Sequence, residues 1–415
     1  MIEKKRVVLV PEYLERFSCI GSDCEDTCCV GWRVDIDKKT YKKYKNVNDR
    51  EMKPLLNKHI KRRRSNALEI NYAKIVMDSN TACPLLNEEK LCSIQKTLGE
   101  DYLSNVCSTY PRTTNQVNET LEKSATLSCP EVARLVLLNP NGIQFNEIEE
   151  SIDVRNFMNM QINTNREISS TKIDSYFWDL RIFTIQVLQN RSYSISHRLI
   201  ILGMFYQKIQ GYHLEGRLDD IPQQISSYSS LIEDGSFHDA LAGITTSTTI
   251  QMQLLKELTD IRVNKGVQSF RYIECFGELL EGIQYTNDST VEEITKRYQL
   301  AYSEYYAPFM TPNEYILENY LVNYVYKNLF PSTNTITDVF DSYILLVVHF
   351  SLIKLHLIGM AGHHKEDFGV NHVIKLVQSF AKTVEHDSLY LDRVIELLKR
   401  NEYTSMAYMA ILINN

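Results

Sequence analysis

The sequence has few residues that interrupt helices, and it lacks the glycine patterns of nucleotide-binding loops. Its 415 residues include ten prolines and fifteen glycines, which leaves long segments free to form helices. An all-β sandwich, which needs frequent turn residues, is therefore excluded. No two glycines are separated by a single residue, and no Gly-x4-Gly-Lys is present. The chain thus has neither a dinucleotide-binding loop nor a phosphate loop.

The sequence also lacks a large excess of basic residues and an apolar leader. Residues 1–150 carry a net charge of +1 and residues 151–415 one of −8, whereas nucleic-acid binding draws on a basic face. The apolar run Val7–Val10 is too short for the core of a signal peptide. The most apolar window, residues 343–361, contains two histidines and a lysine that lipid would disfavour. We therefore expect a cytoplasmic protein without nucleic-acid or membrane partners.

Cysteine, by contrast, is abundant near the amino terminus. Eight of the nine cysteines lie within the first 129 residues. In a chain without an export signal, this clustering favours metal binding over a disulfide framework, because the cytosol keeps thiols reduced. The candidate metal ligands are Cys19, Cys24, Cys28, Cys29, Cys83, Cys92, Cys107 and Cys129.

The spacing of these cysteines is irregular. The first group, from Cys19 to Cys29, has gaps of four, three and no residues, whereas a zinc knuckle normally has paired cysteines two to four apart. The pattern fits an iron–sulfur centre at least as well as zinc. Because one centre needs four thiolates, the eight cysteines hold either two centres or one centre beside structural cysteines.

The order of the cysteine motifs resembles a known family. Residues 19–32 read Cys-x4-Cys-x3-Cys-Cys-x2-Trp, and three further motifs follow: Cys-Pro-x-Leu at Cys83, Cys-x-Ile at Cys92 and Cys-x2-Tyr-Pro-Arg at Cys107. Together they resemble the cysteine-rich, zinc- or iron-chelating domain of the flagellin lysine-N-methylase family. The resemblance continues through residues 180–199 and 318–331.

This resemblance implies a protein-lysine N-methyltransferase that acts on the ε-amine of flagellin lysines. It further implies S-adenosylmethionine as the methyl donor and an iron–sulfur cluster, most simply 4Fe-4S, on the cysteine-rich segment, with zinc as the alternative metal. The residues themselves leave two other functions open. One is a non-catalytic, metal-binding interaction module, and the other is an iron–sulfur electron-transfer protein.

Lysine methylation requires a neutral attacking amine, so the site must desolvate or deprotonate it. Carboxylates and tyrosines near the cysteine motifs are candidates for this work. We consider Asp35, Tyr110 and Arg112 as catalytic candidates, with Arg112 also able to tune a thiolate cluster. Asp37, two residues after Asp35, is expected to cap a helix that runs to Tyr44.

The expected fold is predominantly α, with a cysteine-rich metal-binding domain over residues 1–150 and an all-helical domain over residues 151–415 that holds the substrate or donor cleft. The polar stretch from Glu147 to Thr171 is interpreted as the boundary between them. Apolar periodicity after residue 173 indicates packed helices. Expected helices cover residues 131–138, 315–329, 343–357, 373–384 and 391–398.

Two local patterns in the helical part carry further expectations. Capping boxes at Ser289 with Glu292 and at Thr311 with Glu314 predict helix starts. Three histidines, His349, His356 and His363, follow one another at intervals of seven residues. We expect Gly359 and Gly362 to interrupt the helix before the third. A core or cleft role is favoured over metal binding, because residues two turns apart are too distant to share an ion.

Overall fold

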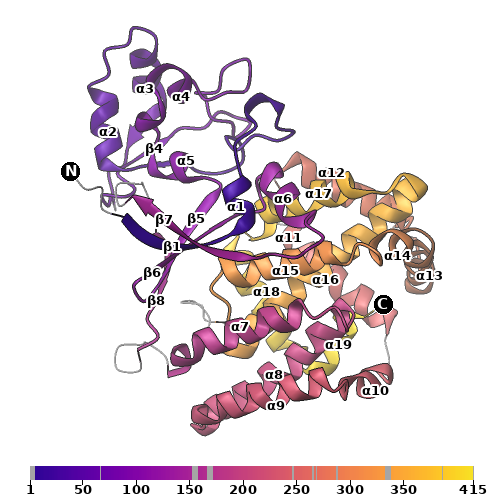
Figure 1. Ribbon diagram of the computed structural model, residues 1–415. Helices are drawn as coiled ribbons and strands as arrows, with labels where there is room; N and C mark the ends of the chain where they lie inside the picture. The colour runs from indigo at the N-terminus through magenta and orange to yellow at the C-terminus, as the bar shows by residue number, and fades with distance from the viewer. Residues whose placement is uncertain are drawn as a thin grey trace.

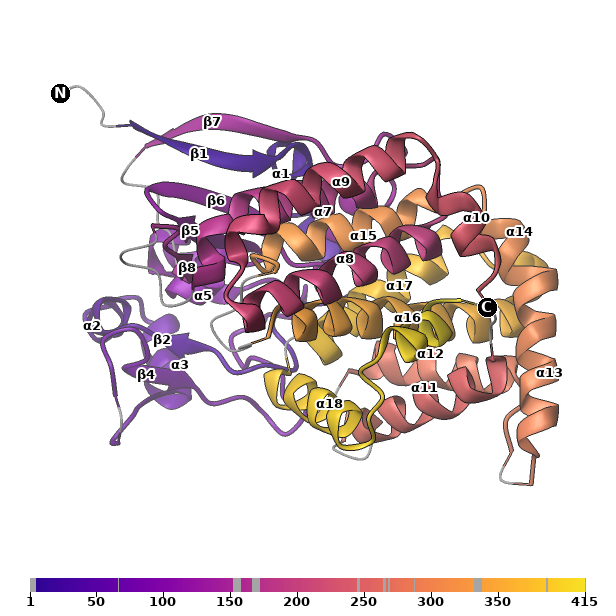
Figure 2. The same ribbon diagram turned by 90° about the horizontal axis from the view of Figure 1, so that it is seen from below.

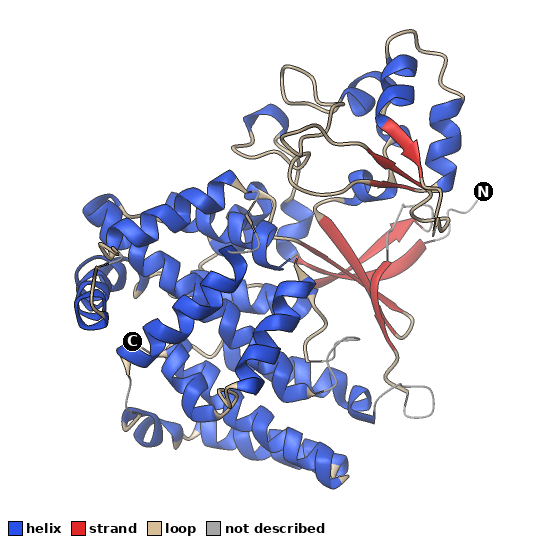
Figure 3. Ribbon diagram, turned by 180° about the vertical axis from the view of Figure 1, so that it is seen from behind, coloured by secondary structure: helices blue, strands red, loops and turns tan. Residues whose placement is uncertain are grey.

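The structure is a computed structural model of the 415-residue chain. It describes residues 5–65, 67–151, 158–165, 172–244, 247–263, 266–267, 269–286, 288–331, 338–385 and 387–414. Two parts of unequal size are visible in Figure 1: a small cysteine-rich lobe (residues 18–110) and a body that contains the remaining described residues. A mixed β-sheet lies between the lobe and the helices of the body (Figure 3).

The sheet of the body has five strands in the order β7-β1-β6-β5-β8. Strands β1 and β6 pair in parallel, as do β5 and β8, while β1–β7 and β5–β6 are antiparallel. The short apolar run Val7–Val10 therefore becomes an interior strand, with Val8 and Val10 almost fully buried. The strands are β1 (Lys5–Pro11), β5 (Arg112–Val117), β6 (Thr120–Ala125), β7 (Phe145–Ser151) and β8 (Met158–Ile162).

The lobe has its own small sheet and its own core. The sheet has the order β2-β4-β3, and the core runs from Val34 to Leu103 without joining that of the body. Asp37 caps α2 by accepting a hydrogen bond from the Thr40 amide at 2.9 Å, as expected. The elements are β2 (Asp35–Ile36), β3 (Ile60–Arg62), β4 (Ala73–Ile75), α2 (Lys38–Lys45), α3 (Met52–His59), α4 (Ser93–Leu98) and α5 (Asn105–Thr109).

Helices make up most of the body, which confirms the predominantly α expectation. They surround the long α16, which lies at the centre in Figure 2. Two π-helical turns, Tyr302–Tyr306 and Ala381–Glu385, interrupt them. The helices are α1 (Glu12–Arg16), α6 (Pro130–Leu137), α7 (Phe177–Leu188), α8 (Ile195–Glu215), α9 (Ile221–Glu233), α10 (Phe237–Ala242), α11 (Thr248–Val263), α12 (Phe270–Gly282), α13 (Val291–Ala301), α14 (Ala307–Met310), α15 (Tyr315–Lys327), α16 (Val339–His364), α17 (Val370–Phe380), α18 (Ser388–Arg400) and α19 (Met406–Ile413).

The expectation that residues 151–415 are all-helical is wrong. Strand β8 lies in this range and forms an edge of the five-stranded sheet, and β7 ends at Ser151, next to the predicted boundary. Both strands fall in or beside the stretch that the sequence suggested was a polar linker. Edge strands with one solvated face tolerate Asn, Gln and Glu, so their polar composition concealed them.

Helix α16 is apolar and long enough to cross a membrane by length and composition alone, but its most apolar window is 100% buried inside the protein. It is therefore a core helix. His349 and His356 are fully buried in it, and the Nδ1 of each lies within 2.8 Å of the carbonyl oxygen four residues earlier. His363 instead lies 3.1 Å from Glu281. The three histidines thus do not share a site.

The expected break before His363 is also wrong, because α16 continues through both glycines to His364. The glycines serve a close helix crossing instead. A Cβ on Gly282 of α12 would lie 1.7 Å from the Gly359 carbonyl oxygen, and one on Gly362 would lie 2.7 Å from the Gly282 oxygen. Small residues at the contact let the backbones of α12 and α16 approach this closely.

Neither predicted capping box forms as expected. The box at the start of α13 uses Thr290 and Glu293, one residue later than expected. Ser289 is engaged elsewhere, since its hydroxyl accepts a hydrogen bond from the Thr286 amide at 3.2 Å. Helix α15 begins at Tyr315, after the turn that contains Thr311. Adjacent hydroxyl residues left the exact cap ambiguous in the sequence.

Candidate functional site

Five thiols gather around the core of the lobe. Cys28 and Cys29 lie on one loop with their sulfurs 4.0 Å apart, and the Cys83 amide donates to the Cys29 carbonyl at 2.8 Å. Burial raises the pKa of Cys107 to about 12, and the neighbouring thiols Cys92, Cys83 and Cys28 contribute to this shift. The group therefore comprises Cys28, Cys29, Cys83, Cys92 and Cys107.

Three thiols form a second group at the edge of the body. Cys129 directly precedes α6, and burial raises its pKa to about 11, with further contributions from Cys24 and Cys19. Burial likewise raises the pKa of Cys24, to which Cys19 adds. The eight predicted ligands thus separate into a group of five and a group of three.

Neither group is arranged as a finished metal site. Among the described residues, no three His, Cys, Asp or Glu side chains stand in positions that could hold an ion together. All nine cysteines are free thiols, and soft thiolates in groups of four are the donors that iron–sulfur clusters and zinc take. The five-thiol group fits such a centre in donor type and number, so its ligand role stays a prediction.

The three catalytic candidates lie in different surroundings. Asp35 is on β2 of the lobe and pairs with Arg33 at 3.0 Å and Arg63 at 2.7 Å. Tyr110 lies where the lobe meets the body, with its hydroxyl 3.2 Å from the Ser128 hydroxyl. Burial holds the Tyr110 pKa well above 10, with Cys129 and Cys28 among the neighbours that contribute. Arg112 stacks on the Phe17 ring. Their catalytic roles stay predictions.

A polar pocket of about 470 Å³ opens between the lobe and the body. We call it the junction pocket. One wall is the loop that leads into Cys28, and the other consists of the ends of α11, α12 and the π-helical turn after α17. Its lining residues are Asp26, Thr27, Val30, Gly31, Asn80, Arg262, Gly266, Ser269, Phe270, Arg271, Lys382, Thr383 and Asp387.

Contacts across the junction hold the cysteine loop against the body. The Lys382 ammonium donates to the Asp26 carboxylate at 2.9 Å and to the Thr27 carbonyl at 3.1 Å. Gln378 donates to Asp26 at 2.7 Å and to the Ser128 carbonyl at 2.9 Å. Because π-helical turns often occur at functional sites, the placement of Lys382 on such a turn supports a functional role for this junction.

The same contacts affect the thiol beside the pocket. A hydrogen bond from Cys29 lowers the pKa of Cys28 to about 7, and the positive charge of Lys382 acts in the same direction. A thiol with a lowered pKa is a better metal ligand and nucleophile than a buried structural one. Of the eight clustered thiols, Cys28 is therefore the one that the junction contacts affect most directly.

The junction pocket was missed from the sequence. Its cationic residues carry no motif: Arg262 and Arg271 lie near each other in the chain, whereas Lys382 comes from a segment more than one hundred residues later. The only local signal was the neighbourhood of Cys28. Proximity in the fold, not spacing in the chain, brings these side chains to the cysteine loop.

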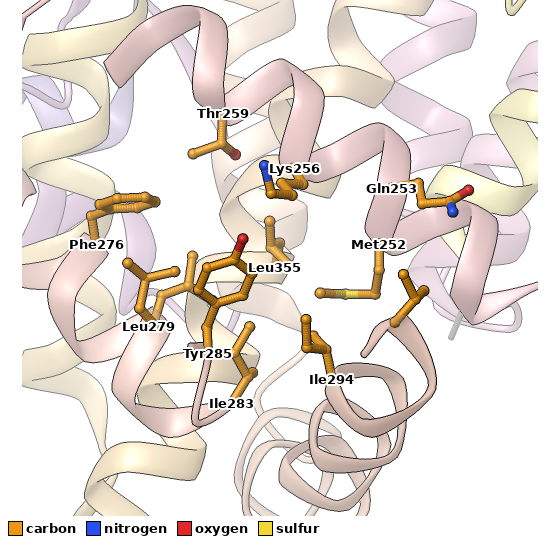
Figure 4. Close-up of a pocket in the computed structure, with 12 residues that line it drawn as sticks. Met252, Gln253, Lys256, Thr259, Phe276, Leu279, Ile283, Tyr285, Ile294 and Leu355 are labelled. Atoms are coloured by element: carbon orange, nitrogen blue, oxygen red, sulfur yellow. The ribbon is translucent and has the colours of Figure 1, made fainter. Parts of the chain in front are cut away.

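A second cavity lies within the helical body and is largely apolar. It has a volume of about 260 Å³. Figure 4 shows Phe276 and Leu279 on one side, Met252 and Ile294 on the other, and the ring of Tyr285 between them. Lys256 is the one charged residue in its lining. With few polar groups to orient a ligand, this cavity is the weaker candidate for a site of chemistry.

Comparison with known proteins identifies the class of the chain. The sequence profile of the FliB lysine N-methylase C-terminal domain matches residues 181–412. Over 422 aligned residues the chain is 25% identical to the lysine-N-methylases of Salmonella typhimurium and of Salmonella choleraesuis, covering 98% of this chain and 99% of each relative. It is 35% identical over 145 residues to the flagellar biosynthetic protein FliU of Salmonella muenchen, covering 35% of this chain and 85% of that protein. No solved structure matches.

These matches, together with the helical body and its junction with the lobe, define a methyltransferase that acts on lysine. The chain belongs to the FliB lysine N-methylase family. This confirms the resemblance that the cysteine motifs indicated. The matched domain covers most of α7, all of α8 through α18 and most of α19, so the body, rather than the lobe, carries the family profile.

Proposed function

We propose that the protein methylates the ε-amine of lysines in flagellin, with S-adenosylmethionine as donor and an iron–sulfur cluster on the lobe. The observation that carries the proposal is the position of the five-thiol group beside a polar pocket of the methyltransferase body. The lysine methyltransferase class comes from the family; the substrate, donor and cluster are the proposed parts.

The transfer needs no oxidant or reductant. The lysine nitrogen forms a bond to the methyl carbon, the bond from that carbon to the sulfonium sulfur breaks, and the amine loses one proton. The electron pair of the broken bond stays on sulfur, which leaves as the thioether of S-adenosylhomocysteine. The chain must bind both partners, exclude water and accept the proton, since free lysine is protonated at neutral pH.

A 4Fe-4S cluster would take its four ligands from the five-thiol group, with zinc as the alternative. Such a centre supplies a covalent cross-link between loops that are distant in sequence, and its charge acts on groups nearby. The group of three is one thiol short of a complete ligand set. The division into five and three therefore favours one centre beside structural cysteines over two centres.

Flagellin is proposed as the protein partner because one relative bears the name flagellar biosynthetic protein. Because flagellin leaves the cell to assemble outside, a methylase using S-adenosylmethionine would act on it in the cytoplasm. The balanced charge of residues 1–150 and the acidic remainder give no basic face for nucleic acid, and the most apolar helix is buried in the core. The proposal accordingly includes no nucleic-acid or membrane partner.

The decisive experiment incubates full-length protein, purified without oxygen, with flagellin from the same organism and methyl-labelled donor. The expected result is label on flagellin lysines, located by mass spectrometry. A matched reaction with flagellin whose lysine amines have been acetylated should incorporate none. Absence of label on the unmodified flagellin, in protein that retains its iron and sulfide, would overturn the proposal.

A further inference from the structure

We propose that the junction pocket is the binding site of the methyl donor, with the donor's carboxylate held by Arg271 and Arg262. This inference rests on the proposed function and adds a location to it. The pocket volume of about 470 Å³ is within the range of small-molecule sites. Four observations about its lining point to a ligand that carries a carboxylate and an aromatic base.

The first observation is that the lining carries positive charge on side chains that are not fully hydrogen-bonded to other described residues. Both carboxylates in the lining are engaged: Asp26 accepts from Lys382 and Gln378, and Asp387 accepts from the Tyr390 amide at 3.0 Å. Among the described residues, the guanidinium of Arg271 donates only through Nε, to Gln378 at 2.9 Å. Its two terminal nitrogens can therefore donate two parallel hydrogen bonds to the carboxylate of a ligand.

Arg262 is the second cation and is buried. It is 8% exposed, and its Nε and Nη1 donate to the carbonyl oxygens of Thr383 at 2.9 Å and Gly266 at 3.1 Å. These carbonyls orient the guanidinium but do not neutralise it, because they carry no net charge. No carboxylate among the described residues pairs with it. A buried cation without such a partner is costly, and an anionic ligand group would relieve that cost.

The second observation is that two helices begin at the pocket. Helix α12 starts after Ser269 and α18 after Asp387, and each has 13 residues. The amide groups of a helix N-terminus favour negative charge in front of them. The N-terminus of α18 already has the Asp387 carboxylate in front of it, so the end of α12 is the one that acts in the same direction as the two arginines.

The third observation is an unsatisfied hydroxyl. Thr383 lines the pocket, is 4% exposed, and its Oγ1 has no hydrogen-bond partner among the described residues. A buried hydroxyl without a partner destabilises a fold. A polar ligand atom in the pocket would satisfy it, so Thr383 independently indicates that something polar binds here.

The fourth observation is an aromatic ring at the rim. Phe270 lines the pocket yet is 72% exposed, which is unusual for a large apolar side chain. An aromatic face next to a cationic pocket suits a ligand with a planar base joined to a carboxylate. S-Adenosylmethionine combines these two features, whereas an acidic peptide has only the carboxylate.

The apolar cavity lacks these features. It lies on the same two helices, since α11 contributes Met252 to Thr259 and α12 contributes Phe276 to Leu280. At a rise of about 1.5 Å per residue, its centre is roughly 10–15 Å along α11 from Arg262. Its rings, Phe276 and Tyr285, could contact a base, but Lys256 is the one charged side chain in its lining among the described residues, so it offers the carboxylate much less.

The test measures binding rather than turnover. Calorimetric titration of anaerobically purified, full-length protein with S-adenosylhomocysteine should give a dissociation constant for the wild type. We expect Arg271→Ala to raise that constant about 10- to 100-fold, because a charge-assisted hydrogen bond to a carboxylate is lost. Arg271→Lys, which keeps the charge but not the paired geometry, should recover part of the loss. The control variant Arg400→Ala, at the far exposed end of α18, should leave the dissociation constant unchanged.

A second variant separates ligand binding from folding. Thr383→Val removes only the unpartnered hydroxyl and keeps the branched shape. We expect its melting temperature without ligand to equal or exceed that of the wild type, while the dissociation constant for S-adenosylhomocysteine rises about threefold to tenfold. A structural role for this threonine would instead lower the melting temperature.

Three results would overturn the inference, and they differ from one another. If the wild type binds S-adenosylhomocysteine and both Arg271→Ala and Thr383→Val bind it equally well, the donor site is elsewhere and the proposed function stands. If the wild type binds neither S-adenosylhomocysteine nor S-adenosylmethionine and transfers no label, the donor assignment of the proposed function fails as well. Normal donor binding by Arg271→Ala with lost flagellin binding would assign the pocket to the protein substrate.

Discussion

The lobe and the body of this protein are stabilised by different means. The body has a large core that runs from Val8 to Ile413 and a small separate cluster around Phe177. It also buries ion pairs such as Arg181 with Glu122, whose side chains are 3% and 1% exposed. The lobe has short helices, a three-stranded sheet and a separate core in which Cys83 is buried and Cys29, Cys92 and Cys107 pack at the edge. Apolar packing and buried charge pairs stabilise the body, whereas the core of the lobe contains thiols at positions where apolar side chains would otherwise pack.

This difference assigns separate tasks to the two parts. The extensive core of the body suits it to position the proposed substrate and donor. If the lobe holds the proposed metal, the state of that metal is coupled to the wall of the junction pocket, because Asp26 and Thr27 precede Cys28 directly. The junction is thus where loss of metal would first affect catalysis.

The largest effect is expected from removing a ligand of the five-thiol group. Cys107→Ser should lose most of the bound iron or zinc and unfold the lobe, because metal binding to such sites contributes on the order of 10 kcal/mol to folding. Hydrogen exchange followed by mass spectrometry should show fast exchange in residues 30–107. Peptides from α15 and α16 should stay protected.

The matched control for this experiment is Cys129→Ser, in the group of three. It should keep most of its metal and the protection of the lobe. Equal metal loss in both variants would mean that the two groups form one centre or two equivalent ones. Loss of protection in α16 on metal removal would refute the independence of the body.

The next largest effect is expected in the body, from Glu318→Ala. Glu318 is 2% exposed and accepts hydrogen bonds from Arg198 at 2.8 Å and from Arg191 at 3.0 Å. Its removal leaves the buried Arg198 without this carboxylate and should lower the free energy of unfolding by about 3–5 kcal/mol. Urea unfolding followed by far-ultraviolet circular dichroism measures this change.

An exposed pair provides the comparison. Glu215 and Arg217 are 58% and 54% exposed, so Glu215→Ala should cost no more than about 1 kcal/mol. A similar cost for Glu318→Ala would show that its network contributes little. Buried charge pairs would then not distinguish the stability of the body from that of the lobe.

The sequence predicted the parts of the fold that depend on local patterns. The Asp37 cap, the helices near residues 315 and 391, and the shared neighbourhood of most cysteines all follow from short-range features. The apolar stripe of α16 was also visible, but its two glycines pointed to a break, because only the tertiary contact with Gly282 of α12 explains them.

The sequence failed where distant segments meet. Strand β8 pairs in parallel with β5, about forty residues earlier in the chain, and a polar edge strand has no strong local signature. The junction pocket takes residues from four separate stretches between Asp26 and Asp387. Arg191, Arg198 and Glu318 lie in the two later segments of the family resemblance. They form one ion-pair network in which Arg198 and Glu318 are buried and Arg191 is 46% exposed.

The smallest expected effect is a pH dependence within the body. Burial lowers the pKa of Lys354 from 10.5 to about 7, and its ammonium donates to the Ile413 carbonyl at 2.9 Å. Above pH 7 the unfolded chain binds one proton more at this position than the folded chain. The free energy of unfolding should therefore rise between pH 7 and pH 9, by at most about 1.4 kcal/mol per pH unit.

Lys354→Met should remove this slope, because methionine does not titrate, whereas the exposed Lys296→Met on α13 should keep it. Urea midpoints at pH 7, 8 and 9 measure the three slopes. Equal slopes in the wild type and Lys354→Met would mean that Lys354 keeps its proton in the folded state. The body would then hold an unpaired positive charge in its core. Its stability would no longer be explained by apolar packing and paired charges alone, and the proposed contrast with the lobe would weaken.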